Sequence, residues 1–85
     1  MNILFSEKAW DDYLYWQKID KNKIKRINIL IKSIQRNWAM DWEWKPEMLK
    51  FWLSWLFSRR IDQEHRLVYL IEWENLNIIA CKFHY

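Results

Sequence analysis

The chain contains no glycine, one proline and one cysteine among its 85 residues. Average usage would give about six glycines in this length, and turns with a positive φ normally rely on them. A single cysteine excludes an internal disulfide, and Cys81 lies in an apolar run, so we expect it to pack in the core. The apolar run at residues 3–5 is too short for a signal peptide or a membrane span. We therefore expect a cytoplasmic protein that does not contact the membrane.

Size and composition indicate one folded domain over residues 1–85, because a chain this short can bury only one core. Hydrophobic residues make up 52% and charged residues 29%, which is typical of a globular chain. The net charge is +3, and the basic residues gather in two stretches. The first holds Lys21, Lys23, Lys25, Arg26, Lys32 and Arg36, and the second holds Lys45, Lys50, Arg59, Arg60, Arg66 and Lys82. Two basic surfaces favour a nucleic-acid partner, although the first could equally be a solvated helix face.

Hydrophobic periodicity in the first half predicts a strand followed by two helices. Residues 3–5 predict the strand, and Ser6 is a candidate N-cap for the first helix. Phe5 and Trp10 have the spacing of a hydrophobic staple. Asp20 can cap the second helix, whose apolar positions are Ile24, Ile27, Leu30, Ile31 and Ile34. The two helices should form a hairpin that packs on a sheet.

The second half is rich in β-branched and aromatic residues and predicts strands. A loop is expected over residues 37–45, before Pro46. Strands are predicted at residues 49–51, 56–61, 66–72 and 76–84, with hairpin connections at 62–65 and 73–75. The predicted fold is α+β: an N-terminal strand and a two-helix hairpin packed on a mainly antiparallel, twisted sheet.

Several side chains have the chemistry needed to cut RNA without a metal. Such cleavage needs a base for the 2′-hydroxyl, an acid for the departing 5′-oxygen and cations for the growing phosphate charge. Glu47, His84 and the arginines of the second basic stretch are candidates. Taken alone, Glu47 could be a solvated ion-pair partner, and His84 could simply be exposed near a frayed end. No Gly-rich phosphate loop, metal-ligand spacing or serine-nucleophile signature occurs, so we expect no metal and no cofactor.

Six segments of the chain resemble the YoeB toxins of the RelE superfamily. They are residues 10–16 (WDDYLYW), 45–47 (KPE), 49–50 (LK), 58–61 (SRRI), 64–69 (EHRLVY) and 84–85 (HY). The resemblance runs nearly end to end and implies the RelE-like microbial ribonuclease fold. It also implies catalytic roles for Glu47 as base, His84 as acid and Arg66 as the main transition-state cation. The substrate-binding residues that it implies are Lys50, Arg60 and Tyr85.

The resemblance further implies the toxin of a type II toxin–antitoxin pair. Such a toxin would be an endoribonuclease that cuts mRNA in the ribosomal A site and inhibits translation, with its basic helix on ribosomal RNA. A YefM-like antitoxin would cover the site, and operator DNA would be reached only through the toxin–antitoxin complex. A homodimer is an additional option. The alternatives are a noncatalytic ParE-like toxin that binds a protein, an antitoxin-dependent corepressor, and a ribonuclease that needs no ribosome.

Strand alternation refines these assignments. Arg59 and Arg60 must project to opposite faces of the sheet, as must Phe83 and His84. Taking Arg60 and His84 as the residues that face the site leaves Phe83, Cys81 and, unless it reaches around the chain end, Tyr85 on the opposite face. We expect Arg59 to contact solvent or a partner. His65 lies in a predicted turn, and we expect a structural role for it.

The tryptophans offer an explanation for the missing glycines. Six of eight lie after residue 37, mostly where turns are expected: Trp38, Trp42, Trp44, Trp52, Trp55 and Trp73. In YoeB-like sequences the positions matching Trp42, Trp44 and Trp55 are typically glycine. Our hypothesis is that the source organism reads UGA as glycine, which would place glycine at all six positions of the natural protein. The alternative is a genuine aromatic surface on which bases stack.

Overall fold

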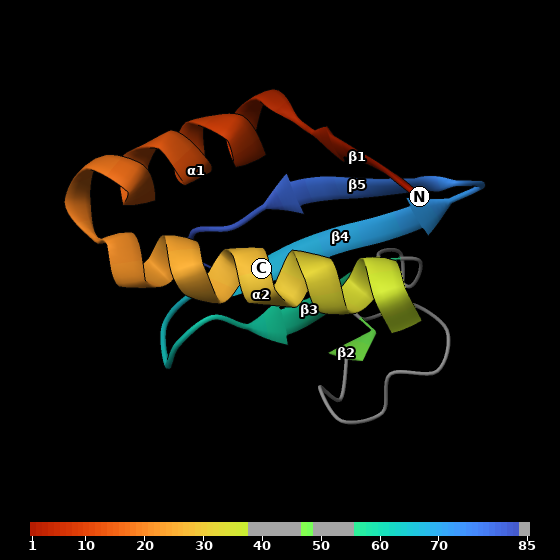
Figure 1. The fold of residues 1–85 in the computed structure, drawn as a ribbon. Coiled ribbons are helices and arrows are strands. Elements are labelled where there is room, and N and C mark those ends of the chain that lie inside the picture. Colours follow the sequence, from red (N-terminus) through yellow and green to blue (C-terminus); the bar gives the residue numbers. More distant parts are fainter. Residues whose placement is uncertain (38–46, 49–55, 84–85) are drawn as a thin grey trace.

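The computed structural model describes residues 1–37, 47–48 and 56–83. Its elements are β1 (Asn2–Phe5), α1 (Glu7–Ile19), α2 (Lys21–Asn37), β2 (Glu47–Met48), β3 (Phe57–Arg60), β4 (Arg66–Glu72) and β5 (Asn75–Ala80). The helices form a hairpin that packs on one face of the sheet (Figure 1). The predicted α+β class, the N-terminal strand and the helix hairpin are confirmed.

The strands of the described residues form one sheet in the order β1-β5-β4-β3-β2. β1 runs parallel to β5, and every other pairing is antiparallel, which confirms a mainly antiparallel sheet. After the helix hairpin, the described strands β2, β3, β4 and β5 follow one another across the sheet in chain order. Strand β4 has β3 on one side and β5 on the other, so residues at its start can be reached from both neighbours.

Local hydrogen bonds explain why α1 begins where the sequence predicts. The Ser6 hydroxyl accepts from the Ala9 amide at 3.0 Å and donates to the Ile79 carbonyl at 2.7 Å. It therefore caps the helix and ties it to β5. The rings of Phe5 and Trp10 meet edge to face at 5.8 Å, which confirms the hydrophobic staple.

The second helix also follows its predicted pattern. The Asp20 carboxylate accepts from the Asn22 amide at 3.0 Å, as expected of a capping residue. The predicted apolar face of α2 packs on the sheet, with Ile24 partly buried and the other four positions buried. The core also contains Ala9, Trp16, Leu67, Tyr69, Leu76, Ile78 and Cys81. The expectation that Cys81 packs in the core is confirmed.

The strand predictions hold in part. Strand β4 has the predicted bounds, but β5 ends at Ala80 rather than at residue 84. Phe83 has φ 62°, outside the strand region, so the alternation argument was wrong for this residue. The chain leaves the sheet because other elements bond its backbone there, as described below. The predicted loop at 37–45, apart from Asn37 at the end of α2, and the predicted strand at 49–51 lie outside the described residues.

The turn between β4 and β5 contains Trp73, which has φ 57° and is 92% exposed. A left-handed conformation costs a residue with a Cβ roughly 1–2 kcal/mol, and glycine avoids that cost. Position 73 is therefore one that suits glycine, in agreement with the recoding hypothesis. The other five late tryptophans lie outside the described residues. No helix in the described parts of the chain is long and apolar enough to cross a membrane.

Candidate functional site

Predicted site residues meet where β3 ends and β4 begins. Arg60 and Arg66 are register partners across the β3–β4 hairpin. Glu47 lies one strand further out, where its backbone pairs with Ser58 of β3. Because neighbouring strands lie about 4.8 Å apart, the sheet brings these positions of β2, β3 and β4 into one region.

Arg66 is oriented by a buried serine. Its Nε donates to the Ser58 hydroxyl at 3.0 Å, and Ser58 is fully buried. The bond fixes the direction of a half-buried guanidinium whose charge is permanent. Ser58 was not among the predicted site residues. The signal was available, because Ser58 lies two residues before Arg60 and so shares its face of the strand.

Phe83, which follows β5, is hydrogen-bonded to the residues at the start of β4. Its amide donates to Nδ1 of His65 at 2.7 Å, and its carbonyl accepts from the Arg66 amide at 2.9 Å. Phe83 is the last described residue, and His84 follows it in the sequence. The buried His65 ring also meets Trp16 edge to face at 4.7 Å. These contacts agree with the structural role expected for His65.

The expectation for Arg59 was wrong. Arg59 is 1% exposed, and its guanidinium donates to the Tyr69 hydroxyl at 3.1 Å and to the Ser33 hydroxyl at 3.4 Å. Alternation puts it on the face that α2 covers, whereas the neighbouring Arg60 is exposed. A buried guanidinium requires hydrogen bonds, and hydroxyls of β4 and α2 provide them here. Arg59 is therefore a buried structural residue that links the sheet to α2.

The β3–β4 turn is organised by Asp62. Its carboxylate accepts from the Glu64 amide at 2.8 Å and from the His65 amide at 2.7 Å, and it lies 2.8 Å from the Lys23 amine. Burial acts to raise the pKa of Asp62, but the hydrogen bonds from Lys23 and the two amides outweigh it and lower the pKa to about 2. The same hydrogen bond raises the pKa of Lys23. One lysine of the first basic stretch thus holds the turn that presents His65 and Arg66.

The first basic stretch has two parts in the structure. Lys23 and Arg26 contact the sheet region, Arg26 through a 3.2 Å hydrogen bond to the Arg60 carbonyl. The exposed cations of α2 are Lys21, Lys25, Lys32 and Arg36. Their separations of four, seven and four residues place them on one side of the helix. Helix α2 contains no acidic residue, so this stripe is uniformly positive.

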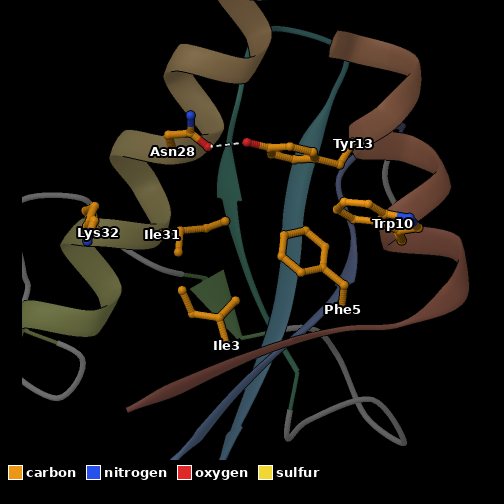
Figure 2. Close-up of a pocket in the computed structure, with 7 residues that line it drawn as sticks. All are labelled: Ile3, Phe5, Trp10, Tyr13, Asn28, Ile31 and Lys32. Atoms are coloured by element: carbon orange, nitrogen blue, oxygen red, sulfur yellow. Dashed lines mark hydrogen bonds between the residues drawn. The ribbon is translucent and has the colours of Figure 1, made fainter.

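An apolar cavity lies away from this region. It has a volume of about 390 Å³ and is lined by Ile3, Phe5, Trp10, Tyr13, Asn28, Ile31 and Lys32 (Figure 2). At its edge the Tyr13 hydroxyl donates to the Asn28 side-chain oxygen at 2.8 Å. The cavity is formed by β1, α1 and α2 and contains none of the predicted site residues. It is therefore a separate feature from the start of β4.

Not every predicted site residue can be placed. Lys50, His84 and Tyr85 lie outside the described residues, and Glu47 is placed by its backbone only. Of the predicted set, the structure brings together Arg60, Arg66 and the backbone position of Glu47. Within the described ranges, no group of three His, Cys, Asp or Glu side chains is arranged to hold a metal ion.

Known proteins resemble this chain along nearly its whole length. The family profile described as "YoeB-like toxin of bacterial type II toxin-antitoxin system" matches residues 5–85. The chain is 51% identical to "Toxin YoeB" of Escherichia coli strain K12 over 85 residues, covering all of both chains. Two solved structures from Staphylococcus aureus are each 49% identical and cover all of this chain and 98% of theirs. One is a heterotetrameric YoeB–YefM toxin–antitoxin complex with a TM-score of 0.89, and the other is a YoeB dimer with a TM-score of 0.90. The chain therefore belongs to the YoeB-like toxins of bacterial type II toxin–antitoxin systems.

Proposed function

We propose that this toxin is a metal-independent endoribonuclease that cuts mRNA in the ribosomal A site and so inhibits translation. The observation that carries the proposal is the convergence at the start of β4. Arg60 and Arg66 are register partners, and the backbone of Glu47 pairs with the serine that orients Arg66. The carbonyl of Phe83, the residue before His84 in the sequence, accepts from the Arg66 amide. To these two cations the proposal adds the carboxylate of Glu47 and the imidazole of His84.

The proposed reaction uses the RNA's own 2′-hydroxyl. Glu47 takes its proton, the 2′-oxygen forms a bond to phosphorus, and the bond from phosphorus to the 5′-oxygen breaks. His84 protonates the departing 5′-oxygen, leaving a 2′,3′-cyclic phosphate and a 5′-hydroxyl. Arg66 stabilises the charge that develops on the phosphate oxygens. The residues proposed to bind the substrate are Lys50 and Arg60 for phosphate and Tyr85 for the nucleotide. DNA lacks the attacking hydroxyl and would not be cut this way.

The positive stripe on α2 supports a ribosomal partner. Its cations extend from Lys21 to Arg36, which is about 22 Å along a helix with a 1.5 Å rise. Such a stripe can contact several phosphates of ribosomal RNA without reading its sequence. A chain of 85 residues has little surface with which to position an mRNA by itself. The ribosome would therefore supply the alignment of the scissile phosphate.

The proposed protein partner is a YefM-like antitoxin that covers the catalytic region. The Staphylococcus aureus relatives support this, since one is a YoeB–YefM complex and another a YoeB dimer. We propose that this toxin forms a corresponding complex in the cytoplasm, that a homodimer forms in the absence of antitoxin, and that operator DNA is bound only through the complex.

The test is cleavage of mRNA programmed on purified ribosomes, compared for the parent and for single Glu47→Ala, Arg66→Ala and His84→Ala variants. Loss of a general acid, base or transition-state cation should lower the rate by about 100- to 10,000-fold. Glu72→Ala, at the far end of β4, is the matched control, and its cleavage rate should stay within about twofold of the parent's. Lys25→Glu and Lys32→Glu should instead weaken ribosome binding and raise KM.

Two outcomes would contradict the proposal. Full toxicity of Glu47→Ala and His84→Ala, with toxicity abolished by the α2 charge reversals, would identify a noncatalytic ParE-like binding toxin. Equal cleavage of the same mRNA with and without ribosomes would identify a free ribonuclease. Either result leaves the family assignment unchanged.

A further inference from the structure

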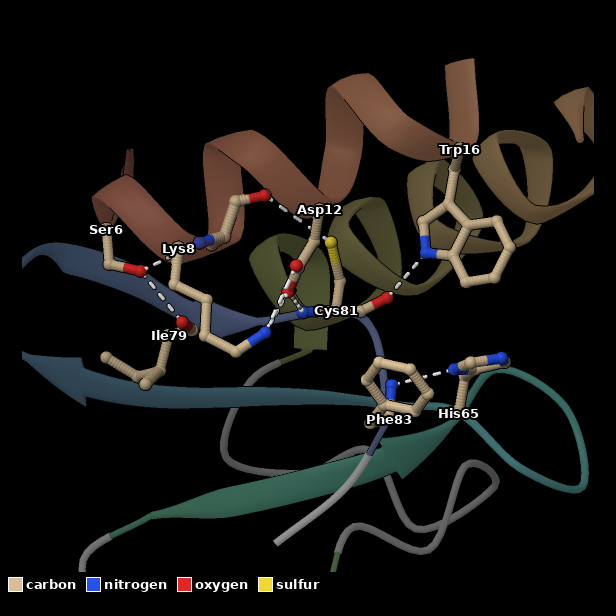
Figure 3. Close-up of polar contacts among 9 residues, drawn as sticks. Ser6, Lys8, Asp12, Trp16, His65, Ile79, Cys81 and Phe83 are labelled. Atoms are coloured by element: carbon tan, nitrogen blue, oxygen red, sulfur yellow. Dashed lines mark hydrogen bonds and ion pairs between the residues drawn. The ribbon is translucent and has the colours of Figure 1, made fainter. Parts of the chain in front are cut away.

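The segment 81–83 leaves the sheet, yet four of its backbone groups are bonded to other elements. The Cys81 amide donates to the Asp12 carboxylate at 3.0 Å, and the Cys81 carbonyl accepts from the Trp16 indole at 2.8 Å (Figure 3). The Phe83 amide donates to Nδ1 of His65 at 2.7 Å, and the Phe83 carbonyl accepts from the Arg66 amide. Side chains of α1 and of the β3–β4 turn, together with the Arg66 amide of β4, thus provide the partners of these backbone groups.

Phe83 has a backbone conformation that is unfavourable for a residue other than glycine. Its φ of 62° is in the left-handed region, which costs a residue with a Cβ roughly 1–2 kcal/mol. Such conformations persist when their surroundings determine them, and they are concentrated at functional sites. Here the determining contacts are the two hydrogen bonds that fix the amide and carbonyl of Phe83.

His65 is built to hold this amide. The residue is 8% exposed, and its ring lies edge to face against Trp16, with ring centroids 4.7 Å apart. Figure 3 shows the ring between Trp16 and Phe83, with Nδ1 directed at the Phe83 amide. Asp62 accepts from the His65 amide at 2.7 Å, so the backbone that carries the ring is fixed as well. The Nδ1 atom must carry no hydrogen in this bond, because a nitrogen that carries one has no free lone pair to accept with.

We propose that His65 is a positioning residue that sets the direction in which the chain leaves Phe83 and thereby aims His84 at the substrate. The inference rests on the proposed function, in which His84 is the general acid. An acid displaced by about 1 Å can lose up to about 100-fold in rate. Two adjacent residues, His65 and Arg66, hold the backbone of Phe83, which precedes the proposed acid, and Arg66 also supplies the main cation.

The test compares two substitutions that differ in a single property. In His65→Asn the side-chain oxygen can take the place of Nδ1 as acceptor, whereas His65→Leu fills space and accepts nothing. Single-turnover cleavage of ribosome-bound mRNA should fall by about 10- to 100-fold in the leucine variant with little change in KM. The asparagine variant should recover most of the rate. Thermal unfolding of both variants checks that each is folded under the assay conditions.

A double-mutant cycle separates positioning from a merely structural role. If His65 acts through His84, His65→Leu should cause no further loss in a His84→Ala background. An equal loss in both backgrounds would overturn the proposal, as would equal rates for the leucine and asparagine variants.

The failure of the proposed function has a different signature. Full activity of His84→Ala alone would overturn the general-acid assignment and, with it, the catalytic purpose of the His65 contact.

Hydrogen exchange of the Phe83 amide reports on the contact between His65 and Phe83 without an activity assay. Protection should be lost in His65→Leu and retained in His65→Asn. Retained protection in the leucine variant would show that the bond does not hold this segment, and would overturn the inference.

Discussion

The two ends of strand β4 differ sharply. At its start, Arg66 is bonded to Ser58 and Phe83, and the preceding His65 is buried. At its end, Glu72 leads into Trp73, which is 92% exposed. Each end adjoins a non-glycine residue with a left-handed backbone, Phe83 with φ 62° and Trp73 with φ 57°. The same unfavourable conformation therefore occurs in two unlike surroundings.

The conformation of Phe83 is imposed by contacts with surrounding elements, whereas that of Trp73 is imposed by its own turn. Hydrogen bonds to both backbone groups hold Phe83, so its conformation is fixed by the elements around it. The exposed Trp73 side chain has little packing that could offset its conformational cost. A tight hairpin turn imposes that φ, and glycine would satisfy it without a steric cost.

The largest difference between the two ends should appear in catalysis. Arg66→Lys keeps the charge but loses the planar fork and the Nε bond to Ser58. We expect cleavage of ribosome-bound mRNA to fall by about 100-fold. Glu72→Gln at the other end should change the rate by less than about twofold. Similar rates for the two variants would remove the functional distinction between the ends.

The turn at the start of β4 should be the more stabilising one. The pKa of Asp62 is lowered to about 2 in the folded state, below its ordinary value of 3.8. Its contribution is thus present above about pH 4 and lost as the pH falls through about 2. Asp62→Asn should lower the free energy of unfolding at neutral pH by about 1–2 kcal/mol, because each pKa unit is worth about 1.4 kcal/mol and solvent screens part of the charge interaction at this partly exposed carboxylate. Urea unfolding at several pH values measures both effects.

The control for this substitution is Asp11→Asn, which changes an exposed carboxylate of α1. It should leave the free energy of unfolding within about 0.5 kcal/mol of the parent. An Asp62→Asn variant with the parent's stability and the parent's acid sensitivity would mean that the carboxylate does not organise the turn.

Glycine at Phe83 should separate stability from activity. Phe83→Gly removes the cost of the left-handed backbone but also the contact between the Phe83 and His65 rings, whose centroids are 5.3 Å apart. We expect the free energy of unfolding to change by less than about 1 kcal/mol. The wider backbone freedom before His84 should lower the cleavage rate about 3- to 10-fold. A variant as active as the parent would show that strain at this residue has no functional value.

The matched substitution at the other end should act on stability alone. Trp73→Gly should raise the free energy of unfolding by about 0.5–1 kcal/mol, because glycine fits the left-handed turn. Cleavage should not change. Trp10→Gly, within α1, should lower stability instead, because glycine is unfavourable in a helix and the staple with Phe5 is lost. Thermal unfolding compares all three proteins, and a destabilised Trp73→Gly variant would contradict the preference for glycine at this position.

Much of the fold could be predicted because its signals are local. The cap at Ser6, the apolar face of α2 and the bounds of β4 each depend on neighbouring residues. The end of β5 at Ala80 could not be predicted, since it depends on bonds from distant side chains such as Trp16. Alternation separated Arg59 from Arg60 but could not say which face the helices cover.

The candidate site was predictable to a similar extent. A hairpin connection at 62–65 makes Arg60 and Arg66 neighbours, as the register confirms. Ser58 could have been identified from strand alternation, because it shares a face with Arg60. The contribution of Asp62 was missed because the partners of a carboxylate depend on three-dimensional proximity. The roles of Glu47 and His84 stay predictions that the experiments above address.

The burial of Cys81 bears on how the toxin responds to oxidants. Burial and the nearby Asp12 charge raise the pKa of this thiol to about 12, and its side chain is fully enclosed. Peroxide and alkylating reagents attack the exposed thiolate form, and this cysteine is the only one in the chain. The folded toxin consequently offers such reagents no reactive sulfhydryl, so its potency should be the same in reducing and oxidising buffers.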